Sequence, residues 1–305
     1  MSIFNTGSQS FSEALNQKEK LNNDKSFFNY INFFRISNGA KSIYLTSDNL
    51  EIDSKANLIS FVNPIGKFYD LEGKPTSYQS KQGQFNQRKN VLHLKKSVKV
   101  FTSDYYLESE KLIYHTVGDL VDASVNVRTK SHLKTNGDFV YLSARKLIAH
   151  PEAGTFKYNG NVKGQIKKKR AYEDDIFIKS QVLSFDSNNN VIFLNDMVEV
   201  KKEFVTATAE KGEIYLDNYN KSLKYFLLND DVLVKESFQL PDGTTIDRKA
   251  VSEQLEGIVS EDKYILTGYP KVFQDKDILK GNKIVLRENN EIIEVDNANT
   301  SFILK

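Results

Sequence analysis

The chain has 305 residues, of which 39% are hydrophobic and 27% are charged, and its formal net charge is +2. This composition excludes an intrinsically disordered chain, and the near-neutral charge gives no reason to expect nucleic acid as a partner. Cysteine is absent, which excludes disulfides, thiolate metal sites and thiol nucleophiles.

Helical patterning is confined to the N-terminal residues. We predict that residues 1–26 are a lead, either disordered or containing a short helix, because Phe11, Ala14 and Leu15 follow a loosely helical spacing. Met1–Phe4 lack the basic flank and apolar run of a signal peptide. No stretch approaches the roughly 18 consecutive apolar residues of a membrane span. These features leave open a cytosolic protein or a protein whose leader is not part of this sequence.

From about Ser42 onward, apolar and polar residues alternate with a period of two. Val, Ile, Leu, Phe and Tyr occupy one parity, whereas Lys, Glu, Ser, Thr and Asn occupy the other. This pattern is typical of antiparallel strands with one buried face. Clusters of Asn, Asp and Lys, such as Asp186–Asn190, separate the strands and favour tight turns. The sequence therefore predicts an all-β fold of long antiparallel strands.

One phrase recurs along this region: a small residue, two polar residues, an apolar–polar–apolar triplet and a turn. It begins at Ser47, Ser80, Ser109, Ala144, Ser180, Ala209, Ser252 and Gly281. The spacing varies from about 29 to about 43 residues, which disfavours a solenoid of identical coils. Each unit is instead interpreted as a pair of long strands, and successive pairs would close over one another as a sandwich or flattened barrel.

The small residue of each phrase predicts a bend in the strand. The inward parity slips by one residue between Ser109 and Leu112, and partner strands slip at Lys96–Ser97 and Asp196–Met197. A slip of one residue is what a β-bulge produces. Bulges that recur at one level would fold the sheet over on itself.

Two stretches resemble a known family. Ile265–Leu286 is similar to the repeat of the OstA-like periplasmic lipopolysaccharide transport proteins of the LptA type, and Ile31–Leu50 resembles the start of LptC, their inner-membrane component. The resemblance runs from Phe27 to the C-terminus and rests on repeat phase. It implies two tandem bent β-jellyroll domains, edge to edge and with open ends, one LptC-like (27–172) and one LptA-like (173–305). LptC normally begins with a transmembrane helix, and this sequence has none, which leaves the anchoring open.

The resemblance implies a non-enzymatic protein without a cofactor, located in the periplasm and associated with the inner membrane. It would form part of the bridge that carries lipopolysaccharide to the outer membrane, and an apolar groove would shield the acyl chains of lipid A. The candidate groove residues are Leu50, Ile52, Leu92, Leu94, Leu112, Tyr114, Phe156, Tyr158, Leu183, Phe185, Ile192, Leu194, Leu255, Tyr264, Leu266, Ile284 and Leu286. The three tyrosines would suit the mouth, where acyl chain meets headgroup.

The implied partners are lipopolysaccharide and other Lpt jellyroll proteins that pair through edge strands. These belong to the inner-membrane extractor complex and the outer-membrane translocon, and end-to-end self-association would use the same edges. The final segment, Thr300–Lys305, is apolar with one terminal lysine. Such an edge strand favours strand addition by a partner.

Two clusters have a simpler interpretation than a binding site. The basic run Lys167–Arg170 could attract lipid phosphates, but Glu173–Asp175 follow it, which favours a charged linker. The histidines are His93, His115, His132 and His150. His115 and His150 occupy equivalent turn positions in their units, so a repeat effect is favoured over metal ligation. The sequence shows neither a nucleophile motif nor a phosphate-binding glycine loop.

Two other classes of protein remain as alternatives. A carbohydrate-active or carbohydrate-binding β-helix would also show alternating repeats, although it would need shorter and more regular coils. A structural β-scaffold would use the same apolar residues as a dry core. Without the family resemblance, a packed core is the default interpretation of the seventeen groove candidates.

Overall fold

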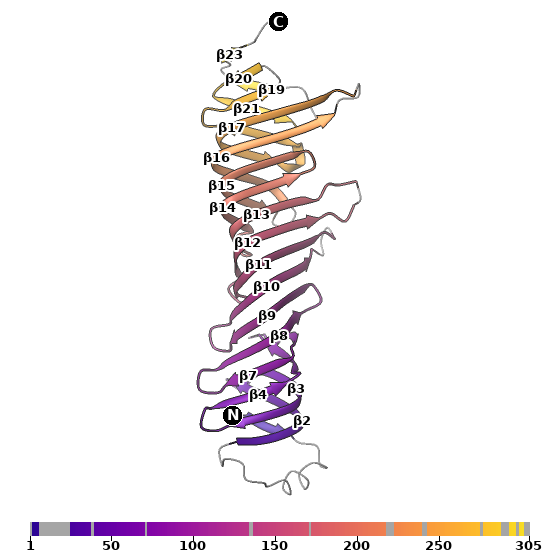
Figure 1. Ribbon diagram of the computed structural model, residues 1–305, viewed down its shortest axis with the longest axis vertical. Helices are drawn as coiled ribbons and strands as arrows, with labels where there is room; N and C mark the ends of the chain where they lie inside the picture. The colour runs from indigo at the N-terminus through magenta and orange to yellow at the C-terminus, as the bar shows by residue number, and fades with distance from the viewer. Residues whose placement is uncertain are drawn as a thin grey trace. The chain divides into compact units, whose positions relative to one another are not determined.

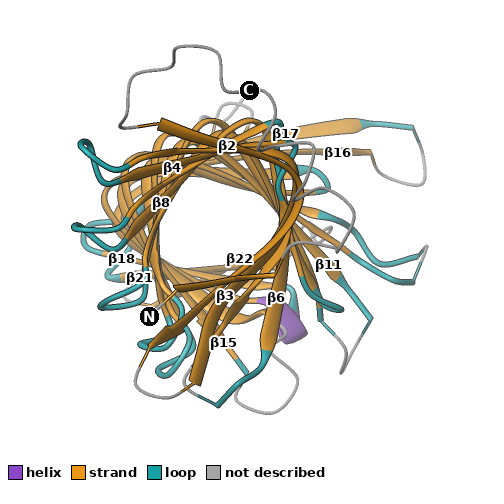
Figure 2. Ribbon diagram, turned by 90° about the horizontal axis from the view of Figure 1, so that it is seen from below, coloured by secondary structure: helices purple, strands orange, loops and turns teal. Residues whose placement is uncertain are grey.

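The computed structural model describes residues 2–5, 25–37, 40–70, 72–133, 137–170, 172–217, 223–239, 243–274, 277–287, 293–296 and 299–301. Of the lead predicted at residues 1–26 as a short helix or disordered, residues 6–24 lie outside this part of the chain, as do Phe302–Lys305 of the predicted final strand. Ser2–Asn5, at the start of this lead, form a strand instead. Nearly all described residues belong to strands, drawn in orange in Figure 2, and the purple segment is a single short 3-10 helix.

The strands are β1 (Ser2–Asn5), β2 (Lys25–Ser37), β3 (Ala40–Asp53), β4 (Leu58–Val62), β5 (Ile65–Tyr69), β6 (Pro75–Gln79), β7 (Gln82–Asn86), β8 (Val91–Phe101), β9 (Tyr105–His115), β10 (Leu120–His132), β11 (Phe139–His150), β12 (Thr155–Lys167), β13 (Ile176–Asp186), β14 (Val191–Lys202), β15 (Val205–Leu216), β16 (Leu223–Gln239), β17 (Thr245–Ile258), β18 (Lys263–Thr267), β19 (Lys271–Gln274), β20 (Asp277–Lys280), β21 (Lys283–Arg287), β22 (Ile293–Asp296) and β23 (Asn299–Ser301). The helix η1 spans Val259–Glu261.

The chain divides into two compact units. Unit one contains residues 1–130 and 145–156, and unit two contains residues 131–144 and 157–305. Within each unit, strands follow one another in chain order (Figure 1). The all-β fold of bent jellyrolls built from long antiparallel strands is confirmed. The boundary at 172/173 stays a prediction.

In unit one, the sheet splits into two faces along a crease. The first half of β3 pairs with β5, and its second half pairs with β4. The next pairings keep this division, because β5 pairs with β6 whereas β4 pairs with β7. β6 and β7 then pair with opposite halves of the single strand β8. Each long strand therefore contributes one half to each face of the fold.

Unit two repeats this arrangement. β13 to β17 are long antiparallel strands in which each strand pairs with the next. The first half of β17 pairs with β19, and its second half pairs with β18. β19 continues to β20 and β23, whereas β18 continues to β21 and β22. We call the face that includes β19 face A and the face that includes β18 face B.

The crease is formed by bulges, as the sequence predicts. The register of β8 and β9 shifts where Lys96 and Ser97 oppose Glu110, and the same shift occurs at Asp196–Met197 in β14. Lys96 and Ser97 have φ of 65° and 52°, and Asp196 and Met197 have φ of 63° and 54°. Left-handed backbone at two successive residues turns the strand sharply. The bulge prediction is therefore confirmed at these positions.

The small residues of the recurring phrase lie at this crease, and six of the eight are buried there: Ser47, Ser80, Ser109, Ala144, Ser180 and Ala209. Serine recurs there for a chemical reason. The hydroxyl of Ser109 donates to the carbonyl oxygen of Lys111 at 3.0 Å, and Ser47 and Ser80 donate to the carbonyl two residues onward at 2.7 and 2.9 Å. The bulge interrupts the ladder of backbone hydrogen bonds, and the hydroxyl supplies a local partner.

Candidate functional site

The inward surfaces of the two faces hold most of the predicted groove residues. Thirteen of the seventeen are buried, and these are Leu50, Leu92, Leu94, Leu112, Tyr114, Tyr158, Leu183, Leu194, Leu255, Tyr264, Leu266, Ile284 and Leu286. The other four, Ile52, Phe156, Phe185 and Ile192, are half-buried. Phe185 and Ile192 pair directly beside the turn that joins β13 and β14. Strand ends have fewer covering neighbours, which explains their partial exposure.

Aromatic side chains fill the interior of unit one. The Phe33 ring lies 5.5 Å from the Phe61 ring and 6.0 Å from the Phe85 ring. Phe68 stacks on Tyr78 at 4.3 Å and also contacts Tyr114 at 4.3 Å. Interplanar angles of 59° and 53° around Phe33 fit the tilted geometry that ring quadrupoles favour. The two faces of unit one are thus held together by interdigitated rings.

A glycine makes room for one of these rings. A Cβ built on Gly66 would lie 2.1 Å from the Tyr44 carbonyl oxygen and 2.7 Å from the Tyr78 ring. Only glycine allows the ring to approach the backbone this closely. Burial also raises the pKa of Tyr78 far above its ordinary value, so that this phenol stays neutral.

The interior of unit two is mainly aliphatic and contains a small cavity. The lining residues are Ile176, Val200, Lys202, Val205, Ala207, Leu223, Phe226, Gly257, Ile258, Val259, Asp262 and Tyr264. They come from both faces of the unit. The cavity measures about 20 Å³, which is room for about one water molecule. Of the predicted groove residues, Tyr264 alone lines this cavity.

Unit two also buries a row of polar groups that the sequence analysis missed. Arg248 Nη1 donates to Glu236 Oε2 at 3.0 Å, and Arg248 Nε donates to Gln274 Oε1 at 3.1 Å. The three residues are direct neighbours across β16, β17 and β19. The side chains of Arg248 and Glu236 are 0% and 3% exposed. Glu236 has the same parity as the buried Val234, and Arg248 has the same parity as the buried Ala250. A charged residue at an inward position of the alternation was therefore the signal that the sequence offered.

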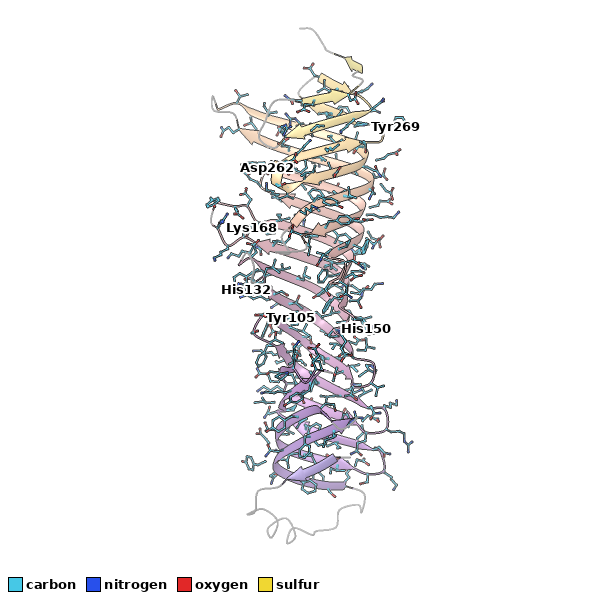
Figure 3. All side chains as sticks on the ribbon, turned by 180° about the vertical axis from the view of Figure 1, so that it is seen from behind. Tyr105, His132, His150, Lys168, Asp262 and Tyr269 are labelled. Atoms are coloured by element: carbon cyan, nitrogen blue, oxygen red, sulfur yellow. The ribbon has the colours of Figure 1, made fainter. Side chains whose placement is uncertain are left out.

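Each unit has a polar contact that joins its two faces at the side opposite the crease. In unit two, Lys202 at the end of β14 on face A forms an ion pair of 2.7 Å with Asp262, which follows η1 on face B. In unit one, Arg35 Nη2 donates to Asn90 Oδ1 at 2.7 Å, and its Nη1 donates to Thr116 Oγ1. We call these contacts the rim contacts. Figure 3 shows Asp262 at one lateral edge of unit two and Tyr269, beside a crease position, at the other.

Burial also shifts the pKa of several groups near the rim of unit one. It lowers the pKa of Arg35 and of His93, and it raises the pKa of Tyr114 and of Asp119. In each case burial removes water from around the charged form. The backbone N–H of Glu152 donates to Asp119 Oδ2 at 2.7 Å and partly opposes the shift of that carboxyl.

The basic run is paired with its own acidic neighbours. Lys168 Nζ lies 3.1 Å from Asp138 Oδ2 and 3.9 Å from Glu173 Oε2, and Arg170 forms an ion pair with Glu173 at 3.1 Å. Asp175 accepts the backbone N–H of Lys168 at 2.9 Å. Figure 3 labels Lys168 beside the ribbon of this turn. These contacts agree with a charged turn, in which Lys168 and Arg170 already have carboxylate partners.

The histidines and the remaining acidic groups form no metal centre in the described part of the chain, where no group of three or more His, Cys, Asp or Glu is arranged to hold a metal ion. His115 and His150 each end a strand, β9 and β11, which agrees with equivalent repeat positions. Among the helices of the described residues, none has the length and apolarity to cross a membrane.

Comparisons with known proteins match the two parts of the chain separately. A family model for lipopolysaccharide assembly, LptC-related, matches residues 2–167, which is more than half of the chain. A model for the LptA/(LptD N-terminal domain) LPS transport protein matches residues 177–292. The two matches have the order that the sequence resemblance predicts.

One solved structure and the curated proteins complete the comparison. The crystal structure of LptH, the LptA homologous periplasmic component of the lipopolysaccharide transport device from Pseudomonas aeruginosa, has 15% sequence identity and a TM-score of 0.38. The match covers 42% of this chain and 95% of the LptH chain. A likeness at this level assigns nothing by itself. No curated protein matches the chain.

Proposed function

The chain belongs to the LptC-related family of lipopolysaccharide assembly, and we propose that it shields the acyl chains of lipopolysaccharide between the faces of its jellyroll units. It is a lipopolysaccharide transport protein in which an LptC-like part precedes an LptA-like part. The proposal concerns how the transport works: the inward residues of both units are the surface that the acyl chains contact.

The observation that carries this proposal is the apolar inward surface of each unit, which is bounded on one side by a crease and on the other by a polar rim contact. Each methylene removed from water contributes about 0.8 kcal/mol, and this term has no direction. Several acyl chains would therefore bind firmly while remaining able to slide along the surface. A binding site built from directional hydrogen bonds would hold the lipid in one place.

The interior must open before a lipid can enter. Leu94, Leu194 and Leu266 are 0%, 1% and 0% exposed, and the cavity of unit two is smaller than one acyl chain. We expect the rim contacts to be the weaker boundary, because each consists of a few side-chain contacts. The Lys202–Asp262 contact is exposed, and water can replace either partner at little cost. The crease, by contrast, is continuous backbone. Opening is therefore expected at the rim.

Several finer statements belong to the same proposal. We place the junction of the two domains at 172/173, and we propose association with the inner membrane in the native protein. Further jellyroll proteins of the bridge would add strands at the terminal edges, where β22 and β23 each pair with one described strand. We propose that the protein catalyses no reaction and needs no cofactor.

Lipid analysis of the purified protein tests the proposed function. The protein would be purified from a lipopolysaccharide-producing host and analysed by mass spectrometry, and lipid A binding would be measured directly. We expect co-purified lipopolysaccharide and saturable binding of lipid A. Absence of both would support a dry structural scaffold and reject the conduit.

A further inference from the structure

The outward surfaces of the two faces of unit two differ in charge. From β13 to β20, the outward side of face A carries more lysines than carboxylates, and these residues are Lys179, Lys201, Lys235, Lys249, Lys271, Lys280, Glu199 and Asp247. On the outward side of face B, the cations have acidic partners. Lys211 forms an ion pair of 2.7 Å with Asp230, and Arg287 lies 3.4 Å from Glu294. Face A is therefore the basic side of unit two.

Four of the lysines gather on the neighbouring strands β16, β17, β19 and β20. Lys235 lies directly opposite Lys249. Lys271 lies directly opposite Lys280. Lys249 pairs with Phe273, two residues after Lys271, which makes Lys249 and Lys271 diagonal neighbours. We call these four lysines the lysine patch. Adjacent strands are about 4.8 Å apart, so the patch extends over about 15 Å.

The four ammonium groups of the lysine patch are not neutralised by carboxylates in the described part of the chain. All four residues are exposed. None of them belongs to an ion pair there, whereas Lys179 on the same surface pairs with Glu199 at 2.6 Å. Asp247 lies diagonally from Lys235 but forms no ion pair with it. Like charges directly opposite each other destabilise a sheet. The patch thus contains two unfavourable cross-strand pairs, and an external anion would offset their repulsion.

Apolar side chains lie among the lysines. Phe273 is half-buried and lies directly opposite Lys249 on one side and Ile278 on the other. Val251 is half-buried and lies opposite Lys271. The stem of a lysine covers apolar surface of this kind while its ammonium group stays in water. A basic sheet surface with apolar side chains between the charges matches the interface of an anionic bilayer.

We propose that the lysine patch binds the surface of an anionic phospholipid bilayer and holds the outward side of face A against it. Protein interfaces are depleted in lysine and enriched in arginine, tyrosine and tryptophan. The outward cations of face A are all lysines. Lysine is a hydrated point charge that needs no fixed partner geometry, and mobile headgroups offer none. The inference extends the proposed association with the inner membrane by naming a surface, and it is independent of the proposed lipid path between the faces.

Binding to vesicles tests the proposal. Vesicles of phosphatidylcholine, with and without phosphatidylglycerol, are sedimented with the full chain and with K235Q/K249Q, K235R/K249R and K211Q/K283Q. We expect the full chain to bind only the vesicles that contain phosphatidylglycerol, and to be released at high salt. Each lysine near an anionic surface contributes about fivefold in affinity, so K235Q/K249Q should lower the partition coefficient about 25-fold. K235R/K249R keeps the charge and should keep the binding.

The matched control is K211Q/K283Q, which removes the same charge from the outward side of face B and should bind like the full chain. An equal loss in K211Q/K283Q would show an effect of net charge and reject the patch. Equal binding of both kinds of vesicle would also reject it. Absence of vesicle binding would overturn the bilayer as the partner, and competition for the patch by polyglutamate would then indicate an acidic protein.

Two further measurements on K235Q/K249Q keep the result unambiguous. Urea unfolding should show a stability no lower than that of the full chain, because two opposite like charges have been removed. A clear loss of stability would mean that these lysines serve the fold, and it would contradict the proposal. Lipid A binding in detergent solution should be unchanged. Failure of the bilayer proposal is therefore distinguishable from failure of the proposed function, in which the full chain would not bind lipid A.

Discussion

The two units share one architecture but keep their faces together in different ways. Unit one fills its interior with interlocked aromatic rings around Phe33 and Tyr78, and its rim contact joins Arg35 to a neutral amide and a hydroxyl. Unit two has a mainly aliphatic interior, a small cavity and a charged rim pair. It also buries the Arg248–Glu236 ion pair. We therefore expect unit one to be held closed more firmly than unit two.

This difference shows how a repeated bend can serve two purposes. The bulges at the crease give both units the same path of the backbone, whatever fills the interior. Interlocked rings are rigid and lose many contacts when they separate. Aliphatic walls with a cavity lose fewer contacts when they part. The residues between the faces, more than the strand topology, decide how easily each unit opens.

Removal of a central ring tests the closure of unit one and has the largest expected effect. Phe33→Ala should lower the free energy of unfolding by about 4 kcal/mol, because Phe33 is fully buried between two further rings. Phe226→Ala in unit two should cost about 1 kcal/mol less, because Phe226 already borders a cavity. Urea unfolding of both variants measures the difference. Equal losses would remove the contrast between the interiors.

Substitutions in the buried Arg248–Glu236 ion pair test how this pair affects the stability of unit two, whose interior lacks the aromatic packing of unit one. Arg248→Met should cost about 3 kcal/mol, because it leaves the Glu236 carboxylate buried without its guanidinium partner. The double variant Glu236→Met/Arg248→Met should recover most of this loss, since apolar replacement of both partners is often neutral. Chemical denaturation gives both values. A double variant as unstable as Arg248→Met would mean that the pair itself stabilises unit two.

Two serines at the crease compare the units at equivalent positions. The hydroxyl of Ser109 donates to the Lys111 carbonyl oxygen, whereas Ser180 Oγ is buried without a hydrogen-bond partner in the described part of the chain. Ser109→Ala should cost about 1 kcal/mol, because the carbonyl loses its partner. Ser180→Ala should be neutral or slightly stabilising. Thermal denaturation followed by circular dichroism compares them, and a larger loss for Ser180→Ala would contradict this account.

Two aspartates give the smallest expected effects, and their pH dependences have opposite signs. Burial raises the pKa of Asp119 in unit one, so the stability linked to this group is present below its unfolded pKa and is lost as pH rises through the folded pKa. Asp119→Asn should therefore stabilise at neutral pH, by less than about 0.5 kcal/mol after solvent screening. Asparagine also tolerates the φ of 44° at this position.

The matched residue in unit two is Asp186. Hydrogen bonds from Asn189, followed by one from Asn188, lower the pKa of Asp186, so its contribution is present above the unfolded pKa and is lost as pH falls. Asp186→Asn should therefore destabilise at neutral pH, and the difference from the unmodified chain should vanish in acid. Stability curves at several pH values between neutral and acidic test both signs. The same sign for both variants would contradict the assigned environments.

The sequence was sufficient to predict the bend but not what lies between the faces. Strict alternation and the recurring small residue predicted the strands and the crease at Lys96–Ser97, because local sterics determine both. The partners of Arg248 depend on the register of three strands, and no local pattern specifies that register. The aromatic residues of unit one, such as Phe33 and Phe61, lie on the inward parity but outside the recurring phrase, and they were not among the predicted groove residues.

The predicted groove residues mark the inward surface, whereas the proposed opening depends on polar residues at the rim. Lys202 and Asp262 are polar, lie at strand ends and are 60 positions apart in the sequence. They meet because the bulges bring the two ends of long strands together. A sequence pattern based on alternation cannot identify such a pair, since its alternation ends where the strand ends.

Site-specific photocrosslinking tests the central claim most directly. A photoreactive residue is placed inward at Leu94 in unit one and at Leu194 or Leu266 in unit two, and outward at the exposed Lys201. Cells that produce lipopolysaccharide are irradiated, and the adducts are detected by immunoblot. We expect lipopolysaccharide adducts at the inward positions and none at Lys201. Equal adducts at inward and outward positions, or none at any inward position, would contradict the claim that lipid travels between the faces.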